Sequence, residues 1–218
     1  MWSFVPQLFY DFLARIVPGV ILMATAVLVV LGPASGVRRL VYPSASTNFY
    51  ALGPLALLLV GAYLLGLLSG ELCRKYFRWR FKARYDAIDD KCKERALAEH
   101  NAALTGLGKP ALSIGVSQLP NVAVMRDHIR EVNPANAARL LKVRAEKRLC
   151  EVLALGFLGL ALLNLVYLPF ARPVGARLVL ELLLLVGWYS CHRRSFRAHR
   201  HIAAGTCHGW LYGAAPLF

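Results

Sequence analysis

Histidine, cysteine and carboxylate side chains are the groups of this chain most able to bind metals or transfer protons. Five of them gather in the C-terminal tail: His192, His199, His201, Cys207 and His208. Their order lacks the short ligand spacings of a zinc site. A membrane enzyme near the inner interface would have one acid and three histidines to use: Glu71, His100, His128 and His192. The chain has neither paired carboxylates nor a nucleophile spaced next to a base. We therefore predict no catalytic residue, no metal and no cofactor, and keep an enzyme as the third alternative.

Arginine and lysine side chains provide a second chemistry, the binding of anions. The formal net charge is +14, and the stretch from Cys73 to Leu149 carries 17 of the 26 basic residues against eight acidic ones. A field of that sign concentrates lipid headgroups, nucleotides and nucleic acid. Four arginines lie too far from the apolar segments to be needed as lipid anchors: Arg126, Arg130, Arg139 and Arg144. We predict that these four bind a nucleotide or nucleic-acid ligand, and that a soluble partner protein is the alternative trigger.

Basic and aromatic residues are interleaved in the sequence CRKYFRWRFKAR, at 73–84. Beside a membrane, such a stretch anchors a helix to anionic lipid, at about 1 kcal/mol per basic residue. The same composition also suits a phosphate-binding face. The predicted lipid anchor is formed by Arg74, Lys75, Arg78, Trp79 and Arg80.

Four apolar segments must position these groups. Ile16–Leu31, Tyr50–Gly70 and Val152–Ala171 contain no charged residue, and Leu178–Cys191 contains only Glu181. About 20 apolar helical residues cross the hydrocarbon core of a bilayer, which is about 30 Å thick. A mean hydropathy of +0.48 agrees with this interpretation. The sequence predicts an integral membrane protein with four transmembrane helices.

The distribution of basic residues predicts the orientation of these helices. The loops at 32–49 and 170–177 carry only two basic residues each, whereas the middle segment and the C-terminal tail carry most of the others. Positive residues remain on the cytoplasmic side. We therefore predict a multi-pass protein of the bacterial inner membrane with both termini in the cytoplasm.

Glycine, proline and asparagine positions predict where the helices between the spans begin and end. The second span continues without Gly or Pro to Thr105, and a Gly- and Pro-rich loop covers 106–120. We expect a short helix from Val122 to Val132, and then a long helix that starts at Asn133-Pro134, with Asn as cap and Pro in the first turn, and enters span three. The predicted fold class is all-α. The predicted regions are an interfacial helix (1–15), spans one and two (16–72), a basic cytoplasmic domain (73–149), spans three and four (150–191) and a cytoplasmic tail (192–218).

Small and polar residues within the spans predict how the helices pack. Ala62, Gly66 and Gly70 recur every four residues and indicate a helix-packing face. Asn164 is the strongly polar side chain deep in span three, and we expect it to make a hydrogen bond between helices. Arg177 lies four residues before Glu181 and can pair with it. The central parts of spans one to three hold no ionisable residue, which argues against a secondary transporter.

Span one is the predicted pore-lining helix. It follows an aromatic N-terminal stretch and a Pro-Gly pair that would let it tilt. A pore without charged rings closes at an apolar constriction. The predicted gate consists of Pro18, Gly19, Val20, Ala24 and Leu28.

Three stretches carry a resemblance to a known group of proteins: Phe9–Gly19, Asn133-Pro134 and Arg139–Cys150. With four spans and a basic helical insert, the layout resembles bacterial four-span membrane effectors of anti-phage defence systems, of the HalA (Hailong) and KwaA (Kiwa) type. The resemblance implies a homo-oligomeric effector whose membrane activity is released by a cytoplasmic signal. The leading hypothesis is a gated channel or membrane-disrupting effector. The alternative is a non-conducting adaptor that docks a soluble enzyme or nucleic acid at the membrane.

Overall fold

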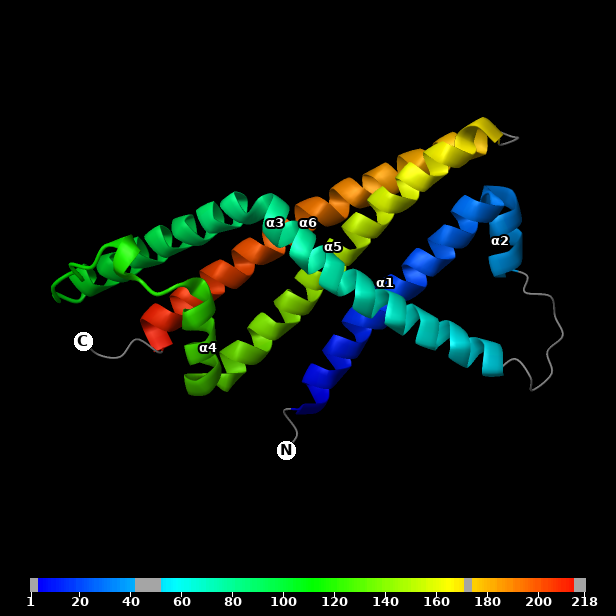
Figure 1. The fold of residues 1–218 in the computed structure, drawn as a ribbon. Helices are drawn as coiled ribbons and strands as arrows, with labels where there is room; N and C mark the ends of the chain where they lie inside the picture. The colour runs from blue at the N-terminus through cyan, green and yellow to red at the C-terminus, as the bar shows by residue number, and fades with distance from the viewer. Residues whose placement is uncertain (1–3, 42–51, 171–173, 214–218) are drawn as a thin grey trace. The chain divides into compact units, whose positions relative to one another are not determined.

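The computed structural model describes residues 4–41, 52–170 and 174–213, and every regular element within them is helical. Figure 1 shows six α-helices: α1 (Phe4–Leu31), α2 (Pro33–Val41), α3 (Leu52–Gly106), α4 (Val122–Val132), α5 (Pro134–Tyr167) and α6 (Val174–Gly213). Two short 3-10 helices, Val116–Gln118 and Leu168–Phe170, complete the list. The predicted all-α class is confirmed for this part of the chain. The ends of the predicted first and last regions, 1–3 and 214–218, lie outside the described residues, as do the first two residues of span two.

Local signals set several helix ends where the sequence predicts them. Asn121 caps α4 by accepting a hydrogen bond from the amide of Ala123 (3.0 Å). The side chain of Asn133 accepts one from the amide of Asn136 (3.1 Å), directly before α5 begins at Pro134. Asparagine caps satisfy amides that have no partner in the first turn. The predicted short helix at 122–132 and the long helix from Pro134 into the third apolar segment are both confirmed.

Several helices are longer than their predicted parts. α1 runs unbroken through Pro18, so the interfacial segment and the first apolar segment form one helix. α6 joins the fourth apolar segment to the histidine-rich tail. α3 covers the second apolar segment and the basic stretch, with non-helical backbone at Phe81 (φ −120°, ψ 18°). The expected loop after span one contains α2.

The chain divides into two compact units. Unit 1 comprises Met1–Phe77 and Arg148–Ser195, and unit 2 comprises Arg78–Lys147 and Phe196–Phe218. α3, α5 and α6 each contribute residues to both units.

Unit 1 is built from α1, α2 and parts of α3, α5 and α6. α5 and the first half of α6 lie side by side in Figure 1. Two small apolar clusters hold these helices together. The first is centred on Leu22, Cys73, Val152 and Leu153. The second is formed by Val29, Ala161, Leu180 and Leu184.

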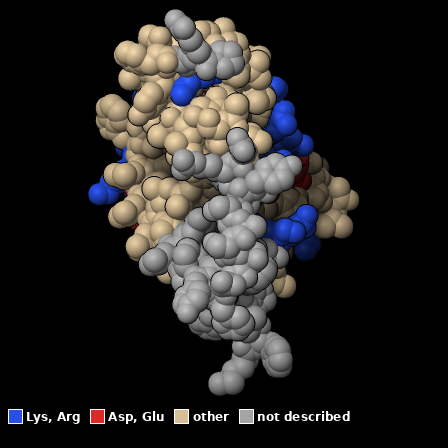
Figure 2. All heavy atoms as spheres, turned by 90° about the vertical axis from the view of Figure 1, so that its right-hand side faces the viewer, with Lys and Arg blue, Asp and Glu red and all other residues tan. Residues whose placement is uncertain are grey.

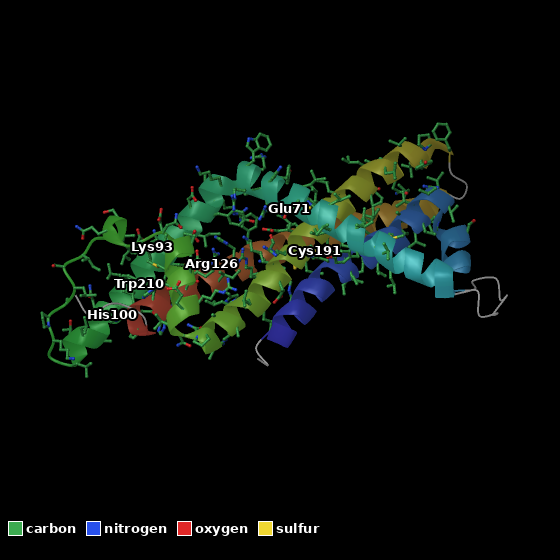
Figure 3. The ribbon with its side chains drawn as sticks, turned by 60° about the horizontal axis from the view of Figure 1, so that its bottom comes forward. Glu71, Lys93, His100, Arg126, Cys191 and Trp210 are labelled. Atoms are coloured by element: carbon green, nitrogen blue, oxygen red, sulfur yellow. The ribbon has the colours of Figure 1, made fainter. Side chains whose placement is uncertain are left out.

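Unit 2 has one larger apolar core. Met125 and Ile129 of α4 are at most 1% exposed and pack with residues of α3 and α6. Trp210, labelled in Figure 3, belongs to the same core. The buried members are Ala96, Leu97, Leu119, Val122, Met125, Ile129, Ala203, Cys207, Trp210 and Leu211.

Two described helices are long and apolar enough to cross a membrane. They are Pro134–Phe170, with a window hydropathy of 2.2, and Val174–Gly213, with 1.5. Only 39% and 22% of these two windows are buried, whereas the core helix of a soluble protein would be mostly covered. Arg15–Leu31 is a shorter apolar stretch. These features hint at membrane association, and the four-span topology stays a prediction.

Candidate functional site

Unit 1 exposes its large apolar side chains. Of the 27 large hydrophobic residues that are exposed in the described part of the chain, 22 lie in unit 1 and five in unit 2. Leu68 and Leu72 of α3 are 64% and 65% exposed, and Leu182 and Leu183 of α6 are both 62% exposed. The space-filling view in Figure 2 shows a face on which the described atoms are mostly those of uncharged residues or His, with Lys and Arg at its margins. Apolar exposure on this scale is typical of a surface that contacts lipid or another protein.

The same unit buries polar side chains. Asn164 is fully buried, Arg177 is 8% exposed and Glu181 is 9% exposed. Asn164 Nδ2 donates to Glu181 Oε2 (2.9 Å) and to the carbonyl of Arg177 (3.2 Å). Asn164 Oδ1 accepts from the guanidinium of Arg177 (3.2 Å). Asn164 therefore links α5 to two charged residues of α6, and the predicted interhelical hydrogen bond is confirmed.

Arg177 extends this network to α1. Its guanidinium donates to the carbonyl of Val29 (2.9 Å). Val29 lies four residues before Pro33, and proline has no amide hydrogen to donate to that carbonyl. A buried carbonyl without a partner is costly. Arg177 therefore satisfies the end of α1, and the buried polar cluster of Val29, Asn164, Arg177 and Glu181 connects three helices.

Close backbone contacts join α1 to α3. A methyl group on Gly19 would collide with the backbone of Ala62, and one on Gly66 would collide with the backbone carbonyl of Arg15. A methyl group on Gly70 would lie 4.0 Å from the side chain of Val152 of α5. The predicted small-residue face thus lies at helix contacts within one chain.

The predicted gate residues lie at the same contacts. Pro18 is fully buried and Gly19 packs on α3, whereas Val20, Ala24 and Leu28 are half-buried. Leu28 contacts the cluster around Val29. The Pro-Gly pair lies inside a continuous helix that packs on α3. The gating role stays a prediction.

The predicted lipid anchor is exposed along α3. Trp79 is 79% exposed, and Arg74 forms an ion pair with Glu71 (2.6 Å), which Figure 3 labels. Phe77, by contrast, is 3% exposed and packs 5.9 Å from the ring of His192. The interleaved aromatic residues therefore divide between the interior and the surface. The exposed members are Arg74, Lys75, Arg78, Trp79 and Arg80.

The four predicted ligand-binding arginines all belong to unit 2. Arg130 and Arg139 are exposed, and Arg126 and Arg144 are half-buried. Arg126, labelled in Figure 3, lies 3.7 Å from the carboxylate of Asp127. α4 carries the first two and α5 the last two, with a turn at Asn133 between the helices.

Unit 2 also contains a polar cluster that sequence reasoning missed. His199 Nε2 lies 3.0 Å from Asp89 Oδ1, and His199 Nδ1 lies 3.2 Å from Lys147 Nζ. Lys147 is placed over the ring of Tyr85 (4.4 Å), which itself contacts the His199 ring (4.4 Å). Asp89 also lies near the half-buried thiol of Cys92. Burial, with a smaller contribution from Asp89, raises the pKa of Cys92.

Two further histidines of unit 2 lie beside an aromatic ring. His100 and His208 both pack on Tyr212, at 4.8 and 4.2 Å. The described residues contain no group of three or more His, Cys, Asp or Glu side chains that could hold a metal ion. The five cysteines, all of which lie among the described residues, form no disulfide.

Comparison with protein-family models, with curated proteins and with solved structures found no match.

Proposed function

We propose that unit 1 lies in a bacterial inner membrane as four spans and that unit 2 and both termini lie in the cytoplasm. The distribution of side chains supports this proposal. Unit 1 exposes leucine and buries Asn164, Arg177 and Glu181. Unit 2 buries methionine, isoleucine and tryptophan and exposes basic residues. Lipid as the solvent around unit 1 and water around unit 2 account for both patterns.

A reporter enzyme fused to the chain tests this topology. Fusions after Val37 and after Gly115 report on the two sides of the proposed membrane. We expect a cytoplasmic reporter to be active after Gly115 and inactive after Val37. Cytoplasmic activity after Val37 would contradict the proposed topology.

The proposed activity is that of a homo-oligomeric channel or membrane-disrupting effector, gated through unit 2 by an anionic ligand or a partner protein. The charge surplus of residues 73–149 supports an anionic trigger. α3, α5 and α6 each contribute residues to both units, so the backbone of all three connects the basic unit 2 to the apolar helices. The resemblance to defence effectors supports a role in anti-phage defence.

Recording from the purified protein in a planar bilayer tests the activity. We expect conductance that a nucleotide or short oligonucleotide opens. A protein that conducts under no condition would instead be the membrane adaptor. The contact of Gly19 with α3 favours that alternative, because it holds the predicted gate helix in place.

The ligand site is tested by reversing charge. Arg126, Arg130, Arg139 and Arg144 changed together to Glu should abolish the ligand response and leave membrane insertion intact. The matched control reverses four other exposed basic residues of unit 2: Lys82, Lys91, Arg95 and Lys109. An equal loss in both variants would show that net charge, and not the predicted site, determines the response.

The predicted gate has its own test. Polar substitution of Val20, Ala24 and Leu28 should make cells leak ions if α1 lines a closed pore. If these variants cause no ion leakage and a polar substitution in α5 is toxic, the gate does not lie in α1.

A further inference from the structure

Three helices of unit 2 meet at one imidazole ring. His199 of α6 contacts Asp89 of α3 through Nε2 (3.0 Å) and Lys147 of α5 through Nδ1 (3.2 Å). The side chains of His199 and Asp89 are 15% and 22% exposed. Tyr85 of α3 covers the ring at 4.4 Å. The described contacts thus place a carboxylate, an ammonium and a phenol around one histidine.

The protonation state of the ring decides which contacts are favourable. An ammonium group can only donate, so Nδ1 accepts from Lys147 only while Nδ1 carries no proton. The neutral ring then carries its proton on Nε2, on the side of Asp89. Neither Nε2 nor Asp89 Oδ1 makes a well-directed hydrogen bond among the described residues. This contact depends on charge more than on direction, and it strengthens when the ring becomes a cation.

We propose that His199 is a proton-sensitive link between the three helices of unit 2. Proton uptake turns Nδ1 into a donor that faces another donor, so the contact with Lys147 is lost and α5 loosens from α6. The same proton turns the contact with Asp89 into an ion pair, so α3 and α6 stay joined. Of the two neighbouring helices, only α5 loses its contact with the histidine ring. The link between the helices does not depend on the proposed function. An effect of its loss on a membrane gate would rest on that function.

Hydrogen exchange of the full chain in lipid nanodiscs tests the link without measuring conductance. Exchange is followed at about pH 7.5 and about pH 5.5, on the two sides of the range in which histidine titrates, and corrected for the intrinsic rates. We expect protection of the backbone around Lys147 to fall about fivefold at the lower pH, as for the loss of one hydrogen bond. Protection around Asp89 should remain.

Variants assign the effect to this histidine. In His199→Gln the difference between the two pH values should vanish, whereas His100→Gln, a matched change at a ring that packs on Tyr212, should retain it. Lys147→Met should also abolish the difference, because no ammonium remains to oppose the proton. A wild-type chain without the difference, or a His199→Gln chain that keeps it, would overturn the proposal. If His199→Gln does not fold, the Lys147→Met chain decides: a Lys147→Met chain that keeps the difference between the two pH values would overturn the proposal.

Discussion

In unit 1, Leu182 and Leu183 are 62% exposed while Asn164 is fully buried. In unit 2, Ile129 is fully buried while Arg130, the next residue along α4, is exposed. Within one chain, α5 and α6 expose leucine and bury a polar side chain in unit 1, whereas α4 buries isoleucine and exposes arginine in unit 2. We propose that lipid around unit 1 and water around unit 2 make each pattern favourable in its own surroundings.

Removal of Arg177 should have the largest effect on unit 1. In Arg177→Leu, Glu181 and Asn164 stay buried without the guanidinium, and the carbonyl of Val29 loses its donor. We expect a loss of about 4 kcal/mol in the free energy of unfolding, as for one broken partner of a buried charged group. Thermal unfolding in detergent micelles measures it.

The control is Arg193→Leu, an exposed position on the same helix. A triple change of Asn164, Arg177 and Glu181 to Leu should regain most of the stability, because well-packed apolar residues replace buried charges at little cost. If Arg177→Leu were as mild as Arg193→Leu, the buried polar cluster would not hold the three helices together.

Truncation of the core of unit 2 should have the next largest effect. Ile129→Ala removes a fully buried side chain and should cost about 3 kcal/mol through lost burial and the cavity that remains. Val124→Ala on the same helix is the control, because Val124 is 59% exposed. Hydrogen exchange of α4 measures both variants. Equal effects would mean that α4 does not pack as the described core requires.

A methyl group added at the α1–α3 contact tests how closely these two helices pack within unit 1. Gly19→Ala places Cβ against the backbone of Ala62 and should cost about 2 kcal/mol, as is typical of overpacking. Gly159→Ala adds the same methyl group where nothing lies within 4 Å and should be nearly neutral. Thermal unfolding separates the two variants, and a neutral Gly19→Ala would show that the two helices do not pack this closely.

The smallest effect concerns the thiol of Cys92. Burial first, and the charge of Asp89 second, raise the pKa of Cys92 above its ordinary value. The thiolate is the reactive form, so the pH midpoint of its alkylation should lie above that of a free thiol, and Asp89→Asn should lower it. Because the folded pKa is raised, the stability from this thiol is present below the ordinary thiol pKa and is lost as the pH rises above it. An unshifted midpoint in the native chain would contradict the half-buried placement.

Short-range features were predictable from the sequence. Asn133 and Pro134 act within one turn of α5, so the start of that helix followed from local chemistry. The apolar segments and the basic stretch were likewise identified from their amino-acid composition. The small-residue spacing of Ala62 and Gly66 indicated a contact but not that α1 would fill it.

Contacts between distant residues were not predictable. Arg177 and Val29 are 148 positions apart, and Lys147 and His199 are 52 apart. Pro33 was the one local sign, since it deprives the carbonyl of Val29 of a helical partner. Nothing near His199 in the sequence indicates Asp89 or Lys147, because only the packing of three helices brings these side chains together.

We propose that lipid surrounds unit 1 and that water surrounds unit 2. Spin labels at single introduced cysteines, in a chain whose five native cysteines are replaced, measure this directly in nanodiscs. Leu165 and Leu182 represent unit 1, and Leu107 and Val124 represent unit 2; all four are exposed. We expect oxygen, which dissolves in lipid, to relax the labels of unit 1. A water-soluble nickel complex should relax the labels of unit 2. Nickel relaxation at Leu165 and Leu182 equal to that at Leu107 and Val124 would contradict it.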